Sequence, residues 1–103
     1  MFARVARYEV EPGRTNEAVE AFRDAAAQLE SVSGLTGGYV LADSEDGMIM
    51  TITFWESRAA MDSSEVKAAG LRRQAANSVD GNVVSVHCLD VPIEIGSNAR
   101  SAV

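Results

Sequence analysis

The chain has 103 residues, enough for one small domain and too few for two. Hydrophobic residues make up 47% of the sequence and charged residues 23%, as in ordinary globular proteins, which excludes a disordered or fibrous chain. Nine Lys and Arg residues against fifteen Asp and Glu residues give a formal net charge of −6, which argues against nucleic acid or an anionic membrane surface as the partner.

The cysteine content and the N-terminus predict the compartment. Cys88 is the single cysteine, so it cannot form a disulfide bond within the chain. Together with the lack of an apolar leader after Met1, this favours a reducing environment, and we predict a cytoplasmic protein. No apolar run approaches the roughly 20 residues that a membrane-spanning helix needs, so no membrane association is predicted.

The first part of the chain predicts a strand followed by a helix. Residues 2–10 alternate in a strand-like pattern and end at a Pro-Gly turn. The helix is predicted to begin at Thr15 or Asn16, either of which can cap it, and to close at the Ser-Gly turn of residues 33–34. Its apolar residues recur at spacings of three and four, at Ala18, Phe22, Ala25, Leu29 and Val32.

A hairpin follows. Residues 35–42 and 48–55 are predicted strands, joined by a polar turn at residues 43–47. The second of these strands is rich in β-branched and aromatic residues and carries no charge, so both of its faces are predicted to be covered. Gly37 and Gly38 inside the first strand predict a bulge or a close approach of two backbones.

The rest of the chain predicts helical structure and a final strand. Ser57 is a predicted N-cap, and residues 58–79 have a helical composition that is interrupted at 62–65, so a short turn before a longer helix and one continuous helix both fit. The last strand is predicted over 82–92. Residues 1–93 then form one domain, and residues 94–103 are predicted to be a mobile tail.

The order of these elements predicts the fold class. Strand, helix, strand, strand, helix, strand is the ferredoxin-like α+β arrangement, a four-stranded antiparallel sheet with two helices on one face. The apolar content of the last two strands leaves the second face of the sheet too hydrophobic for water, and such a face marks an interface. We therefore predict a homodimer in which two sheets pack face to face.

Three short motifs resemble a known family. They are Met-Phe-Ala-Arg-Val at residues 1–5, Gly-Leu-Thr-Gly-Gly-Tyr at 34–39, and Phe-Trp-Glu-Ser at 54–57 followed by Ala-Ala-Met at 59–61. Over roughly residues 2–93 the chain resembles the antibiotic biosynthesis monooxygenase-like family of dimeric α+β barrels. The resemblance implies two sheets packed into one barrel, with a ligand cavity in each subunit between sheet and helices.

The resemblance also implies an activity. Family members with assigned activities either oxidise polycyclic phenols or anthrones to quinones without metal or flavin, or degrade haem. The haem-degrading members use an axial histidine on the second helix, and the matching residues 69–74 contain none, which disfavours haem degradation. The expected function is a cofactor-independent monooxygenase acting on a phenolic or polycyclic aromatic small molecule. The alternative is a non-catalytic dimeric module that binds a small apolar ligand or another protein.

Oxygenation without a cofactor requires a base, hydrogen-bond donors and a dry pocket. Histidine is the residue type that titrates nearest neutral pH, and His87 is the only one in the chain, so we predict it as the base; the alternative is a packed or interface residue. Arg4 is the predicted oxyanion donor. Trp55, Tyr39 and Phe22 are predicted to line the ligand cavity, with packing in the core as the alternative for Trp55. The hydroxyl groups of Tyr39 and Tyr8 would add further hydrogen-bond donors.

The remaining charged residues have structural interpretations. Arg4 and Arg7 lie on opposite faces of the first strand, so one of them is predicted to be buried and paired, with Glu56 or Asp90 as its partner. The arginines at 72–73 are predicted to lie on a solvated helix face near Glu65 or Asp80.

No metal or cofactor is predicted. Cys88 is expected to be buried, and Cys88 and His87 point to opposite faces of their strand, so they cannot share a metal ion. The glycines at 34–38 follow a helix, which is the wrong order for a phosphate-binding loop.

Overall fold

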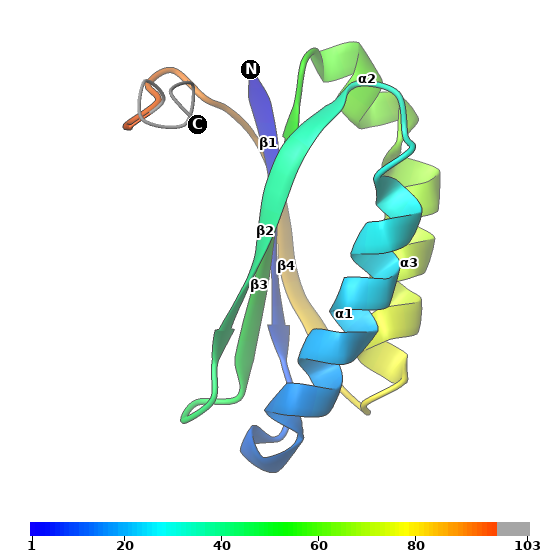
Figure 1. Cartoon of the computed structure of the whole chain (residues 1–103), viewed down its shortest axis with the longest axis vertical. Helices are drawn as coiled ribbons and strands as arrows, with labels where there is room; N and C mark the ends of the chain where they lie inside the picture. Colours follow the sequence, from blue (N-terminus) through cyan, green and yellow to red (C-terminus); the bar gives the residue numbers. More distant parts are fainter. Residues whose placement is uncertain (97–103) are drawn as a thin grey trace.

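The computed structural model describes residues 1–96 and shows the predicted ferredoxin-like α+β fold (Figure 1). Helices α1 and α3 lie side by side on one face of the sheet, and the short helix α2 lies beside the end where β1 begins. The elements in chain order are β1 (Phe2–Glu9), the 3-10 helix η1 (Pro12–Arg14), α1 (Thr15–Leu29), β2 (Leu35–Asp43), β3 (Met48–Trp55), α2 (Arg58–Ser63), α3 (Glu65–Asn77) and β4 (Asn82–Asp90).

The four strands form one antiparallel sheet in the order β2-β3-β1-β4. Residues paired across neighbouring strands share a face, so the register divides the side chains into two sets. One set faces the helices and includes Arg4, Tyr8 and Thr51. The other set, which includes Val5 and Ile52, lies on the opposite face, which none of the helices within residues 1–96 covers; we call it the open face.

Two details of the helix ends differ from the predictions. Neither Thr15 nor Asn16 caps α1, because the turn of η1 precedes it and makes Thr15 the first helical residue; its hydroxyl donates to the carbonyl of Pro12 at 2.9 Å. Helix α1 ends at Leu29, several residues before the predicted turn, and the chain turns at Gly34, whose φ is +88°. The predicted cap at Ser57 is confirmed, since its hydroxyl accepts a hydrogen bond from the amide of Ala60.

The structure also decides between the two arrangements that the second helical stretch allowed. It breaks at Ser64 into the short helix α2 and the longer helix α3. The hydroxyl of Ser64 donates to the carbonyl of Met61 at 2.7 Å, which satisfies a helix-end carbonyl locally. The break turns the chain so that Glu65 begins α3.

The core lies between the sheet and the helices. Tyr8 and Phe22 pack there with their ring centroids 4.5 Å apart. Trp55, Ile49 and Met61 are fully buried. Cys88, in contrast to its prediction as a core residue, is exposed, because in the described part of the chain β4 is an edge strand that pairs with β1 alone.

The glycines of β2 behave as predicted. The pairing of β2 with β3 shifts register between Leu35 and Gly37, which confirms a bulge. At Gly38 the two backbones come so close that an added Cβ atom would lie 2.4 Å from the carbonyl oxygen of Ile52. A side chain at this position therefore requires the strands to separate.

Two further predictions concern membrane-spanning helices and the C-terminal tail. Between residues 1 and 96, the helices are all too short or too polar to cross a membrane. Most of the predicted tail, residues 97–103, lies outside the described residues.

We expect Gly38→Ala to lower the free energy of unfolding by about 1–3 kcal/mol, because the new methyl group overlaps a backbone oxygen that has no room to move. Gly70→Ala is the matched control. It adds the same methyl group in open space on α3, where replacing glycine within a helix stabilises by about 0.5–1 kcal/mol. Urea unfolding measures both, and a Gly38→Ala variant as stable as the wild type would contradict the close approach.

Candidate functional site

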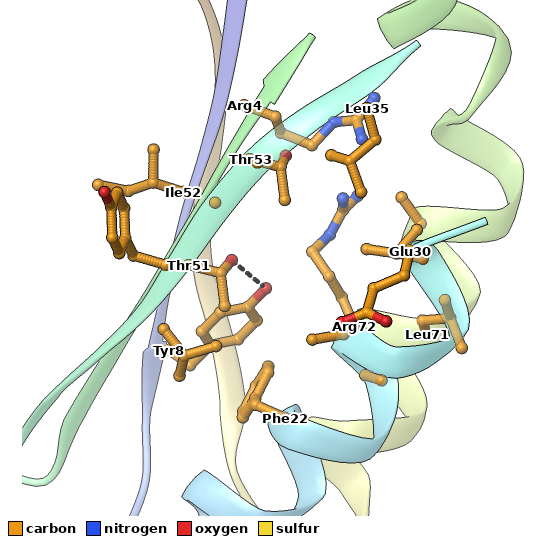
Figure 2. Close-up of a pocket in the computed structure, with 18 residues that line it drawn as sticks. Arg4, Tyr8, Phe22, Glu30, Leu35, Thr51, Ile52, Thr53, Leu71 and Arg72 are labelled. Atoms are coloured by element: carbon orange, nitrogen blue, oxygen red, sulfur yellow. Dashed lines mark hydrogen bonds between the residues drawn. The ribbon is translucent and has the colours of Figure 1, made fainter. Parts of the chain in front are cut away.

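A pocket of about 250 Å³ lies between the sheet and the helices (Figure 2). Strands β1, β2 and β3 form one side, and helices α1 and α3 form the other. A dry apolar cavity of about 150 Å³ accommodates a benzene ring, so this pocket has room for a ligand of one or two fused rings. Its walls are mostly apolar and include Phe22, Leu29, Leu35 and Leu71.

Gly37 and Gly38 contribute to the β2 side of the pocket without side chains. Val40 is the next position of β2 on the helix face, since it pairs with Thr51. At Gly38, on the helix face opposite Thr53, the missing side chain lets the β2 backbone lie close against β3 at the pocket wall. The bulge that the sequence predicted is consequently part of the pocket wall.

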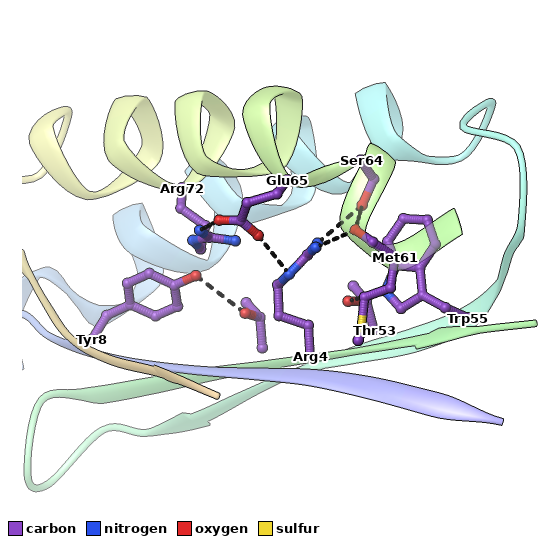
Figure 3. Close-up of polar contacts among 9 residues, drawn as sticks. Arg4, Tyr8, Thr53, Trp55, Met61, Ser64, Glu65 and Arg72 are labelled. Atoms are coloured by element: carbon purple, nitrogen blue, oxygen red, sulfur yellow. Dashed lines mark hydrogen bonds and ion pairs between the residues drawn. The ribbon is translucent and has the colours of Figure 1, made fainter. Parts of the chain in front are cut away.

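Arg4 is the most buried charged residue at the pocket, with its side chain only 4% exposed. Figure 3 shows its guanidinium between the sheet and the junction of α2 and α3. Its Nη2 donates to the carbonyl of Met61 at 2.6 Å, and its Nη1 donates to the hydroxyl of Ser64 at 3.2 Å. The guanidinium also lies over the ring of Trp55, 5.5 Å from its centroid.

The ion-pair partner of Arg4 is Glu65. The Nε atom of Arg4 lies 2.9 Å from Oε2 of Glu65, an electrostatic contact in which the N–H is not directed along a hydrogen bond. The predicted partners, Glu56 and Asp90, were wrong: both are exposed. The break at Ser64 explains the difference, because it brings the first residue of α3 over β1.

Glu65 also binds a second arginine. Its Oε1 accepts a hydrogen bond from Nη2 of Arg72 at 2.5 Å. The two residues are seven positions apart, which is two helical turns, so they lie on the same side of α3. The side chain of Arg72 is only 13% exposed, which corrects the prediction that it is solvated; Arg73 is exposed as predicted.

Tyr8 supplies a hydroxyl group to the pocket. It shares a hydrogen bond of 3.1 Å with the hydroxyl of Thr51. Burial raises the pKa of the Tyr8 phenol above its ordinary value, and this effect outweighs the hydrogen bond to Thr51 and the nearby guanidinium groups, which lower the pKa. The phenol is therefore neutral at physiological pH and can donate a hydrogen bond.

Three of the residues predicted from the sequence lie on the helix side of the sheet. Arg4 and Phe22 line the pocket together. Trp55 is completely buried behind Arg4, where its indole N–H donates to the hydroxyl of Thr53 at 3.0 Å. Trp55 does not line the pocket. It contributes to the site by contacting the guanidinium of Arg4.

The other two lie on the open face. Tyr39 reaches the pocket along β2, but its ring is 54% exposed and packs edge-on against Phe54, with the centroids 6.3 Å apart. His87 pairs with Val5, so its side chain is on the side of the sheet away from the pocket. The structure of one protomer does not bring His87 together with Arg4, and its role as the base stays a prediction.

Sequence reasoning correctly expected Glu65 near Arg72, but it did not place this pair at the site, and it missed Thr51, Thr53 and Glu30. The spacing of seven between Glu65 and Arg72 was a usable signal, because it places both on one side of a helix. Thr51 and Thr53 alternate with apolar residues on β3, and the same alternation puts them on the face of Trp55. Glu30 follows the end of α1 at the pocket, and no sequence signal marks it.

Comparison with solved structures shows the same fold in several proteins at low identity. The haem degrader MhuD from Mycobacterium tuberculosis is 22% identical over 93% of this chain and 100% of its own, with a TM-score of 0.73. A putative antibiotic biosynthesis monooxygenase from Deinococcus radiodurans is 13% identical over 92% and 96%, also with a TM-score of 0.73. One from Caulobacter crescentus is 20% identical over 90% of each chain, with a TM-score of 0.68.

At these identities the structural likeness establishes the fold and not the activity. A search of the curated proteins found no significant match. The family model described as antibiotic biosynthesis monooxygenase matches residues 1–69, which include β1, α1, the β2-β3 hairpin and the start of α3. By this match over two thirds of its length, the chain belongs to the antibiotic biosynthesis monooxygenase family.

Proposed function

We propose that the protein is a cofactor-independent monooxygenase that acts on a phenolic or polycyclic aromatic small molecule in the pocket between sheet and helices. The observation that carries the proposal is the composition of this pocket. Its apolar walls suit a flat ring system, and a neutral phenol and two guanidinium groups face the same space. Family membership supports this choice of chemistry.

The proposed reaction needs no metal or flavin. A phenol or anthrone loses a proton, and the resulting electron-rich anion reduces O₂ directly. One oxygen atom becomes the new carbonyl of a quinone and the other leaves as water. In an anthrone, a CH₂ group and O₂ give C=O and H₂O; in a phenol, the O–H group, one ring C–H group and O₂ give the two C=O groups of the quinone and H₂O. Donors aimed at the developing negative charge lower the barrier, and we assign this role to Tyr8 and Arg4. Apolar walls keep water from competing.

Two alternatives remain distinguishable. A haem degrader predicts a Soret shift when haem is titrated into the protein, and a flat titration would reject it; no histidine is among the residues lining the pocket. A non-catalytic binding module predicts a bound small molecule without oxygen uptake. The open pocket beside Phe22 and Leu29 provides the space that either a substrate or a simple ligand requires.

We also propose that two copies assemble as a homodimer through their open faces. This face carries exposed hydrophobic side chains, including Tyr39, Leu41 and Leu89. Apolar surface of this kind is unfavourable in water and is characteristic of interfaces. A second copy would offer the same surface, which suits a two-fold symmetric contact.

Oxygen uptake tests the enzymatic proposal. We expect the wild type to consume O₂ with a two-ring phenol such as 1-naphthol, and Tyr8→Phe to do so about 100-fold more slowly, because the variant removes one donor to the developing oxyanion. Ser63→Ala is the control: it removes an exposed hydroxyl group on α2 that does not line the pocket, and it should keep wild-type uptake. Uptake in Tyr8→Phe equal to that of the wild type would remove Tyr8 from the mechanism, and a wild type inactive on a panel of phenols and anthrones would reject the proposal.

His87→Ala tests the predicted base. If His87 accepts the substrate proton, the variant loses roughly 100- to 10,000-fold in oxygen uptake while the dimer stays intact. Undiminished turnover would remove His87 from the mechanism. The proton would then have to be accepted at the pocket itself, where the exposed Glu30 offers a carboxylate.

Native mass spectrometry tests the assembly. We expect the wild type to be a dimer and Leu41→Asp to be monomeric. Leu41 is 46% exposed in one protomer, and a carboxylate at this position would lose its water in the interface, which is unfavourable. Val66→Asp is the matched control: its side chain is 88% exposed on α3, away from the open face, and the variant should stay dimeric. A monomeric wild type would overturn the proposal.

A further inference from the structure

We infer that the ligand of the pocket carries a carboxylate and that Arg72 binds this group. The inference rests on the proposed function in that it narrows the substrate class from a neutral phenol to an aromatic acid. Its basis is the arrangement of charges and hydrogen-bond donors at the inner side of the pocket. There the single carboxylate of Glu65 faces two guanidinium groups and does not balance their charge.

The first observation is a local excess of positive charge. Arg4 and Arg72 both line the pocket and both contact Glu65, so two guanidinium groups share one carboxylate. Each arginine side chain is almost withdrawn from water, at 4% and 13% exposure, and a buried charge without its counter-charge is unfavourable. The excess is a feature of this site, since the chain as a whole carries a net charge of −6.

The other carboxylate at the pocket does not remove this excess. Glu30 lines the pocket but is exposed, and within the described residues it forms no ion pair with Arg4 or Arg72. An exposed carboxylate is screened by water and salt, so its effect on the inner guanidinium groups is weak.

The second observation is the inventory of donors. Arg4 uses Nη2 on the carbonyl of Met61 and Nη1 on Ser64, and its Nε faces Glu65. Arginine has five N–H donors, and among residues 1–96 Arg72 makes a hydrogen bond only through Nη2. Figure 2 shows its side chain projecting into the pocket. The planar fork of a guanidinium fits a carboxylate through two parallel hydrogen bonds.

These observations define a ligand with two polar ends. The carboxylate lies on Arg72 from α3, the ring packs against Phe22 and Leu71, and a phenolic hydroxyl reaches Tyr8 on the opposite wall. Such a compound is an aromatic acid of one or two rings with a hydroxyl group remote from the carboxylate. An aliphatic acid would leave the apolar walls unfilled, and a neutral phenol would leave Arg4 and Arg72 with the single carboxylate of Glu65 between them.

A hydroxynaphthoate with its hydroxyl and carboxylate at opposite ends, and the matching naphthol without the carboxylate, provide the test. Binding to the full chain is followed by isothermal titration and by the fluorescence of Trp55, the only tryptophan, which lies beside Arg4. We expect the wild type to bind the acid at least about tenfold more tightly than the naphthol. We expect Arg72→Gln to lose this preference while its affinity for the naphthol stays the same.

Two further variants keep the result interpretable. Arg73→Gln removes the neighbouring exposed charge and should keep the wild-type preference for the acid. Arg72→Lys keeps the charge but not the fork, and should show an intermediate preference, which also covers the case in which Arg72→Gln does not fold. Equal binding of both ligands by the wild type, an acid preference that survives in Arg72→Gln, or binding of neither ligand would overturn the inference.

The outcome is separable from that of the proposed function. An acid preference that depends on Arg72, without oxygen uptake on any acid or phenol, would reject the monooxygenase proposal and keep the carboxylate site. Oxygen uptake on neutral phenols without a preference for acids would do the reverse.

Discussion

The guanidinium of Arg4 carries a positive charge into the space between the sheet and the helices, where its side chain is only 4% exposed. A charge in that position must be paired and hydrogen-bonded, because the cost of desolvating it is several kcal/mol. The carbonyl of Met61, the hydroxyl of Ser64 and the carboxylate of Glu65 satisfy it. All three come from the junction of α2 and α3, so the pairing of this charge ties the break in the second helical stretch to β1.

The polar side of the pocket follows from that junction. Glu65 has one carboxylate oxygen toward Arg4 and the other toward Arg72, so the orientation of the second arginine depends on the pairing of the first. Between Glu65 and Arg72, the same side of α3 carries the small side chain of Ala68. Long polar side chains therefore have room to extend along the sheet. Trp55 supports the cluster from behind, with its ring under the Arg4 guanidinium.

Whether a feature of this molecule can be predicted from the sequence depends on how far apart along the chain the interacting residues lie. Periodicity and turn residues predicted every strand and the order of the elements, because alternation and helical spacing are local properties. The cap of α1 was wrong because η1 shifts the start of the helix, and Cys88 was wrong because apolar neighbours do not reveal an edge strand. The partner of Arg4 was wrong for a stronger reason: a contact between residues 61 positions apart is set by the packing of α3 on the sheet.

The register of the sheet separates two kinds of surface. On β1, Arg4 and Tyr8 face the helices and the pocket, whereas Val5 and Arg7 face the other way. The same alternation places His87 on the open face. Side chains that face the pocket and side chains on the face proposed for assembly therefore alternate along each strand. A substitution on one face leaves the other in place. Turnover and assembly are therefore measured separately for each variant, and a residue such as His87, on the open face, contributes to turnover only if the dimer brings another part of the molecule to it.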